Sequence, residues 1–194
     1  MTDSVLLPST GYVYIAPVGT AMPTLPIDDP LTPGTPWASV GNTSLENGIT
    51  RSVDGDDPST LGSWQNPSLV VTRPVKTRSV TLALQDFTTD TFSLYYGGGQ
   101  VVDQTGTAPY QEGTSTAKAF QIPDAATPQE HALLIIAVDG NFQVVEYYPK
   151  ASFIGSDDIE YDPSALSEMP VTATTLSNGG TYTGVVSERL TFGS

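Results

Sequence analysis

Cysteine is missing from this 194-residue chain. Without thiols there is no disulfide framework, no thiolate metal site and no cysteine nucleophile. Histidine is nearly absent as well: His131 stands alone, and zinc ligation by histidine needs a partner. A Ser-His-Asp site would depend on this one side chain, and no G-x-S-x-G motif accompanies it. We therefore expect His131 to be structural and the chain to be no enzyme, with no metal and no cofactor.

Basic residues are scarce. Seven Lys and Arg stand against 21 Asp and Glu, which gives a formal charge of −14, although only 14% of residues are charged. An average soluble domain has roughly 25% charged residues, so the acidity comes from missing cations. Proteins that bind nucleic acid owe much of their affinity to Lys and Arg side chains, which displace counterions from the phosphates. The composition therefore argues against specific nucleic-acid binding.

Long apolar runs are also lacking. The longest extends from residue 132 to residue 138, far short of the roughly 18 residues that a spanning helix needs. Residues 2–8 carry no basic n-region and no apolar stretch of signal-peptide length. The sequence therefore predicts a soluble protein without a membrane span, and export is not expected.

Apolar and polar residues alternate with a period of two through much of the chain, as in half-buried strands. In residues 78–85, Val80, Leu82 and Leu84 fall on one face. Residues 132–138 and 142–148 predict a hairpin, because the intervening Asp-Gly-Asn suits a tight turn. Further strands are expected at 11–18, 38–43, 48–53, 69–72, 116–122, 152–159, 171–176 and 182–190.

One segment departs from this period. In residues 86–97, Phe92, Tyr95 and Tyr96 lie at helical spacing, a threonine precedes them as a cap, and Gly97 supplies a left-handed exit. Thr- and Val-rich strands surround this short helix. The sequence thus predicts an all-β sandwich or barrel with one short α-helix.

Two irregular stretches interrupt the strands. Residues 17–36 contain six prolines and are expected to form an extended arm or loop. Residues 54–67 lie between two strands and are too long for an ordinary hairpin connection. Loops of this length are usually functional or disordered, and Leu61 and Trp64 favour order.

Three other functions stay open from the residues. Asp54, Asp56 and Asp57 are clustered carboxylates of the kind that calcium prefers, although they do not match the D-x-[DN]-x-[DN]-G loop. Trp37 and Trp64 offer flat rings for a carbohydrate-binding or virion decoration module, or else they begin a core strand and anchor a loop. A glycan-cleaving domain would need a carboxylate pair, which chance alone supplies among so many acids.

The order of several motifs resembles one family. Residues 11–20, GYVYIAPVGT, are similar to the G-x-V-Y-x-A-P-x-G-T opening of phage major tail proteins, the tube-forming subunits of long non-contractile tails. Residues 37–49 resemble the next motif of that family, W-x-x-x-G-x-x-S-x-x-G-I/V. Residues 78–97 resemble its long strand and short helix ending in Tyr-Gly. The resemblance covers the first half of the chain; the second half agrees in being strand-rich.

The resemblance implies a structural virion protein. Such subunits form stacked, hexameric rings that make a hollow tail tube, and DNA passes through the lumen without specific binding. Self-association is then the main interaction, with the tape measure protein, the tail terminator and distal tail proteins as further partners. The location would be the virion tail, assembled in the host cytoplasm. The net charge of −14 fits a wall to which phosphates do not adhere.

The resemblance also assigns roles to the irregular segments. It implies a single tail tube domain over residues 1–194, with an N-terminal arm at 1–9, a long inter-strand loop at 54–67 and a C-terminal arm at 187–194. These three segments are expected to contact adjacent rings. The residues expected to make inter-ring contact are Asp54, Asp56, Asp57, Leu61, Trp64, Val5, Leu6 and Leu7.

Overall fold

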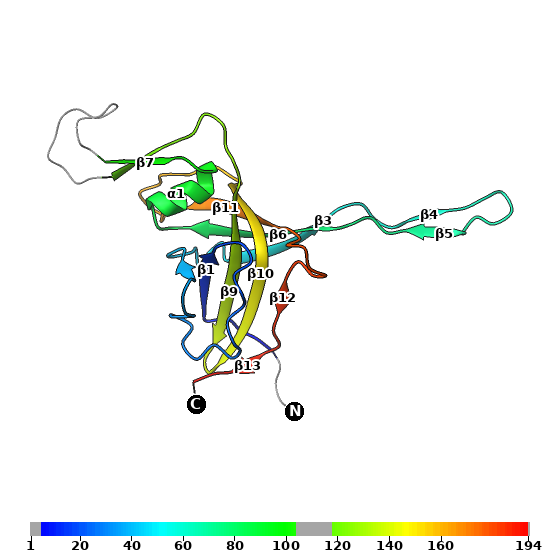
Figure 1. Ribbon diagram of the computed structural model, residues 1–194, viewed down its shortest axis with the longest axis horizontal. Helices are drawn as coiled ribbons and strands as arrows, with labels where there is room; N and C mark the ends of the chain where they lie inside the picture. Colours follow the sequence, from blue (N-terminus) through cyan, green and yellow to red (C-terminus); the bar gives the residue numbers. More distant parts are fainter. Residues whose placement is uncertain (1–4, 104–117, 194) are drawn as a thin grey trace.

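The computed structural model describes residues 5–103 and 118–193, and most of its strands join one bent sheet (Figure 1). The expected all-β class is confirmed, with α1 (Thr89–Tyr96) as the helix within the described ranges. No helix in those ranges is long and apolar enough to cross a membrane. The strands of the main sheet are β1 (Thr10–Ala16), β2 (Ala38–Ser39), β3 (Ile49–Asp54), β6 (Thr77–Leu84), β9 (Gln129–Asp139), β10 (Phe142–Gly155), β11 (Met169–Thr175), β12 (Val185–Val186) and β13 (Leu190–Thr191).

The sheet runs in the order β2-β1-β9-β10-β11-β6-β3, with β12 and β13 also paired to β10. All of its strand pairs are antiparallel. Two small ladders stand outside it. They are formed by β4 (Ser59–Leu61) with β5 (Val70–Thr72), and by β7 (Gln100–Asp103) with β8 (Lys118–Gln121).

Strands β9 and β10 form the predicted hairpin at the centre of the sheet. Phe142 pairs with Asp139 across the turn, and Gly140 takes the left-handed conformation at φ 58°. Residues 132–136 are buried without a break. A strand whose successive side chains are all buried must be covered on both faces, so β9 lies between two layers.

Strand β10 is longer than expected. Residues 152–159 were predicted to be a separate strand, which is wrong, because β10 continues through Pro149 to Gly155. The pairing register with β9 shifts between Tyr148 and Ala151. Proline cannot donate to a ladder and is found at such bulges. Beyond the bulge, β10 exchanges β12 and β13 for β11 as its second neighbour. The two ends of the one sheet face each other as layers, because residues of β1 and β9 share a core cluster with residues of β6 and β11.

The main core lies between these layers. Phe153, Leu133 and Leu82 are completely or almost completely buried in it, and they come from β10, β9 and β6. Leu94 of α1 closes one end of this core. The helix begins at a capping box made by Thr88 and ends at left-handed Gly97, as predicted.

The proline-rich segment, residues 17–36, covers the second face of β9 and β10. It was expected to be an extended arm or loop, and in the structure it is a loop packed against the sheet. The side-chain amide of Gln143, fully buried, accepts from the Ile27 N–H at 3.4 Å and donates to the Ile27 carbonyl at 2.9 Å. The Tyr14 hydroxyl donates to the Pro30 carbonyl at 2.6 Å. These bonds satisfy buried polar groups and hold the segment down.

The C-terminal segment is folded back on its own subunit. One strand was predicted at 182–190; instead β12 and β13 are two short strands along β10. The Arg189 guanidinium lies 3.5 Å from the ring centroid of Phe142 and 3.3 Å from an Asp139 carboxylate oxygen. This cation–π contact and ion pair explain why residues 187–192 do not extend away.

Candidate assembly surfaces

A long hairpin projects from the body of the subunit (Figure 1). The β3–β6 ladder ends at the pair Asp54–Thr77, and the chain continues outward into the β4–β5 ladder and back. We call residues 55–76 the arm. The predicted irregular loop at 54–67 covers only its outgoing half and includes β4. The expectation of irregular structure was wrong there, because Ser59 and Thr72 hydroxyls pair across the ladder at 2.6 Å.

The outer part of the arm is apolar and uncovered. Trp64 is 102% exposed, and Leu61 and its cross-strand partner Val70 are each 57% exposed. The alternative that Trp64 anchors its own loop is wrong, because no described part of the chain covers its side chain. A two-stranded hairpin alone is at best marginally stable in water, and contiguous exposed apolar surface usually marks an interaction site.

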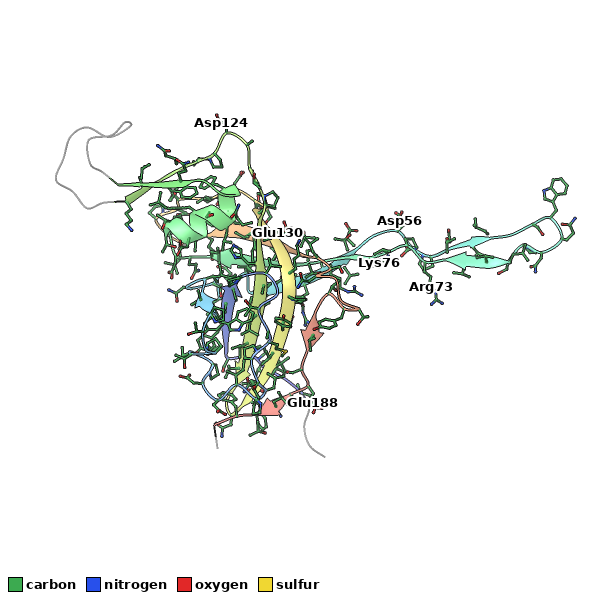
Figure 2. All side chains as sticks on the ribbon, in the orientation of Figure 1. Asp56, Arg73, Lys76, Asp124, Glu130 and Glu188 are labelled. Carbon is green, nitrogen blue, oxygen red and sulfur yellow. The ribbon has the colours of Figure 1, made fainter. Side chains whose placement is uncertain are left out.

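The three aspartates expected to contact other rings lie at the base of the arm. Asp54 accepts the Gly55 N–H at 2.8 Å, and Asp57 lies 3.7 Å from the Lys76 ammonium. Asp56 is exposed, and Figure 2 labels it beside Lys76. Within the described ranges no group of three or more acidic or histidine side chains is arranged to hold a metal ion.

The N-terminal residues lie elsewhere. The Leu7 N–H donates to an Asp139 carboxylate oxygen at 3.3 Å, next to the β9–β10 turn. Val5 and Leu7 are exposed and Leu6 is half-buried. The structure therefore separates the predicted contact residues into two groups, one on the arm and one at the far end of the central hairpin.

Trp37 and His131 are structural within the subunit. Trp37 packs edge-on against Tyr147, with ring centroids 6.1 Å apart. His131 is half-buried with its ring 6.0 Å from that of Phe153, and burial lowers its pKa below the ordinary value. Of the two tryptophans, Trp64 is the exposed one. It lies on the projecting arm and not in a concave site of the kind that encloses a ligand.

A surface that the sequence did not predict surrounds α1. Six rings follow one another: Tyr161 against Phe87, then Phe92, Phe120, Tyr96 and Tyr95, with successive centroids 4.9–6.1 Å apart. We call this set the aromatic row. The helical spacing of its central members was visible in the sequence, but the other rings come from distant segments. Burial, together with neighbouring Tyr96, Asp158 and Asp157, raises the pKa of Tyr95.

A groove of about 860 Å³ lies between β3, β6 and the C-terminal segment. Arg51 in this groove pairs with Glu146 at 3.1 Å. The Tyr148 hydroxyl donates to the same carboxylate at 2.9 Å, and burial raises its pKa to about 12. The Glu146 carboxylate is thus occupied by a cation and a hydroxyl of its own subunit.

Glu168 fastens a loop to the sheet. Its carboxylate accepts from Asn47 Nδ2 at 2.6 Å and from Gln85 Nε2 at 3.0 Å. Burial raises the pKa of Glu168, but hydrogen bonds from Ser44, Asn47 and Gln85 outweigh burial, so that the net pKa is lowered. A lowered carboxyl pKa stabilises the fold above the unfolded pKa and stops doing so as pH falls through the folded pKa.

We predict that Glu168→Gln costs about 1 kcal/mol of unfolding free energy near neutral pH, since hydrogen bonds to a charged acceptor are lost at a partly exposed site. The difference from the unsubstituted chain should shrink as the pH falls below the pKa of an unfolded glutamate, about 4.3. Urea unfolding of both proteins across this pH range measures it. A pH-independent difference would contradict the assignment.

Comparison with known proteins gives consistent results. A family model described as phage tail tube protein matches residues 1–186, which include the whole arm. The chain is similar to the major tail protein Gp23 of Mycobacterium phage D29, with 31% identity over 188 residues, 91% of this chain and 86% of that protein. It is also similar to the major tail protein Gp23 of Mycobacterium phage L5, with 29% identity over 188 residues and the same shares.

Proposed function

This chain belongs to the phage tail tube protein family and is a structural protein of the phage tail, and from that premise we propose that its copies close into hexameric rings that stack into a hollow tube for DNA delivery. One kind of subunit performs both tasks when two different surfaces make head-to-tail contacts, one closing the ring and the other repeating along the axis. The hexamer and the passage of DNA are the parts of this proposal that experiment must decide.

The arm is the observation that carries the proposal. Its outer part exposes Leu61, Trp64 and Val70 to solvent in the free subunit. Such a projection gains stability when it lies on another subunit, so we assign it to the contact between rings. Asp54, Asp56 and Asp57 at its base would set its direction.

The chain termini have a smaller proposed part in stacking. Val5, Leu6 and Leu7 would touch the next ring from the end of the central hairpin. The segment 187–194 would do so through its outer face, since residues 187–192 are held on β10.

Ring closure can use the free edges of the sheet. Strand β3 is the terminal strand on one side, and β2 covers β1 only at Tyr14 and Ile15 on the other. Unpaired edge groups are a template for pairing with another chain. We propose that such pairing between neighbours makes a continuous wall around the bore.

The charge pattern supports free passage of DNA. Among the seven basic residues, Arg51, Lys76, Lys150 and Arg189 are in ion pairs with carboxylates of the same subunit. A wall with many carboxylates and few available cations gives phosphates little to bind. The tape measure protein, the tail terminator and distal tail proteins are the further partners that this function requires, with assembly in the host cytoplasm and a final place in the virion tail.

Negative-stain electron microscopy of the concentrated, purified protein tests the proposal. We expect hollow rods of constant diameter whose length grows with time, and ring symmetry that appears in end-on views. Dispersed globules, with Trp64 fluorescence that changes on addition of sugars, would instead identify a carbohydrate-binding module and overturn the proposal.

A further inference from the structure

We propose that the arm of one subunit docks on the aromatic row of a subunit in the adjacent ring, with Trp64 as the anchor. This inference rests on the proposed function, because it names the surface that receives the arm. The occupant of the aromatic row is thus a second copy of this chain.

The aromatic row offers an apolar surface of the right chemistry. Tyr161 and Phe87 at one end are 77% and 36% exposed. At the other end Val101, 48% exposed, pairs with Phe120 across β7 and β8, and Ile122 follows at 61%. Ring edges and faces accept another aromatic side chain in edge-on or offset geometry. A tryptophan that enters such a surface is a typical energetic centre of an interface.

The arm cannot reach the aromatic row of its own subunit. In Figure 1 the arm leaves the body on one side, whereas α1 and β7 lie on the other. When the arm of one copy meets the aromatic row of a second copy, the contact is head-to-tail, because the two surfaces lie on opposite sides of each subunit (Figure 1). Repetition of a head-to-tail contact closes a ring or builds a filament, and we assign this contact to the filament direction, between rings.

The charge of the surrounding residues distinguishes the aromatic row from the groove of about 860 Å³. Between residues 58 and 75 the arm carries one charged residue, Arg73. It lies on the returning half of the arm after β5 (Figure 2) and makes no ion pair within the described ranges. Tyr161 and Tyr95 are flanked by the acidic residues of segment 157–162. A groove of about 370 Å³ beside that segment is lined by six carboxylates and by no lysine or arginine.

The alternative receiver is less suitable. The groove of about 860 Å³ is lined by Arg51, which is paired with Glu146, and by Arg78, which has no ion pair within the described ranges. Arg73 would therefore meet the like charge of Arg78 there. The carboxylates of segment 157–162 beside the aromatic row attract the Arg73 guanidinium, whereas the arginine side of the 860 Å³ groove repels it. Of these two surfaces, the aromatic row matches both the apolar anchor and the charge of the arm.

The absence of native cysteine makes the contact directly testable in assembled tubes. Subunits with Gln65→Cys on the arm are mixed with subunits that carry Glu160→Cys beside the aromatic row, assembled, and oxidised mildly. Both substitutions leave Trp64 and Tyr161 in place. The matched control replaces Glu160→Cys by Thr181→Cys, which lines the basic groove.

We expect disulfide-linked dimers with Glu160→Cys and about tenfold fewer with Thr181→Cys, because a disulfide forms only between Cα atoms less than about 7 Å apart. Tubes that link through Thr181→Cys, or through neither position, overturn the inference and leave the tube function intact. If the unsubstituted chain forms no tubes, the proposed tube function is contradicted, and the inference that rests on it is contradicted as well.

A second variant keeps the inference falsifiable if the cysteine chains assemble poorly. The double substitution Phe87→Ser and Tyr161→Ser changes side chains that are already exposed, so we expect the subunit to fold and rings to form. The concentration needed for tubes should rise about tenfold, as for the loss of an interface anchor. Leu45→Ser, at another exposed apolar residue that is 92% exposed, is the control. Normal tube formation by the double variant would contradict the inference.

Discussion

A subunit in which residues 55–76 are replaced by Asn-Gly should fold normally and form no tubes. The β3–β6 ladder ends at the pair Asp54–Thr77, and Asn-Gly is the preferred two-residue connection between antiparallel strands. The ends to be joined are already close, because an added Cβ on Gly55 would lie 3.2 Å from Lys76 Cδ. Nearly all of the arm is exposed, so its removal takes nothing from the core.

The loss of tubes should be complete because every subunit loses the same contact. Truncation of one interface anchor typically costs about 2 kcal/mol, and each ring repeats that cost once per subunit. Electron microscopy at increasing concentration measures assembly, and circular dichroism with thermal melting measures the fold. Tubes of ordinary length from the arm-deleted subunit would remove the arm from the mechanism.

Trp64→Phe and Trp64→Ser are the matched pair that separates the anchor from the rest of the arm. Phenylalanine keeps an aromatic ring and should keep tubes, whereas serine should raise the concentration needed for them. Neither change should alter the melting temperature of the free subunit, because Trp64 has no cover within it. A lower melting temperature for Trp64→Ser would show that the side chain supports the subunit itself.

Local sequence patterns were sufficient for the parts of the fold that depend on neighbours in the chain. The β9–β10 hairpin, the strand at 77–84 and the capped helix α1 all follow from alternation, turn residues and capping residues within about ten positions. They are confirmed because no distant contact opposes those preferences.

Long-range packing decided the features that were missed. Nothing near Pro149 shows that one strand can continue through a bulge and change its partner. The proline-rich segment lacks periodicity, and its place on the sheet depends on Gln143, more than a hundred residues away. The C-terminal segment is likewise held by Asp139 and Phe142.

The assembly surfaces likewise include residues that could be identified from the sequence and residues that could not. Leu61 and Trp64 could be singled out because two large apolar residues in a polar stretch need a partner. The aromatic row could not, since Phe87, Phe120 and Tyr161 meet only in the folded chain. Whether these residues contact a neighbouring ring is a prediction that the cysteine experiment decides.

Phe153→Ala should have the opposite effect to arm deletion, with a large loss of stability and little change in assembly. Phe153 is fully buried at the centre of the main core and packs edge-on against His131. Removal of a buried phenylalanine ring typically costs about 3–5 kcal/mol. Urea unfolding of the free subunit measures this loss, and Leu45→Ala at an exposed position should change stability by less than about 0.5 kcal/mol.

Assembly should survive that loss because tube formation draws only on folded subunits. A domain stable by roughly 5–15 kcal/mol that loses about 4 kcal/mol keeps most of its molecules folded at room temperature, so the concentration needed for tubes should barely change. Tubes should in turn raise the melting temperature of Phe153→Ala, since any partner that binds only the folded state stabilises it. If Phe153→Ala remains folded but fails to form tubes, then core packing itself shapes the contact surfaces, and folding and assembly are not separable in this chain.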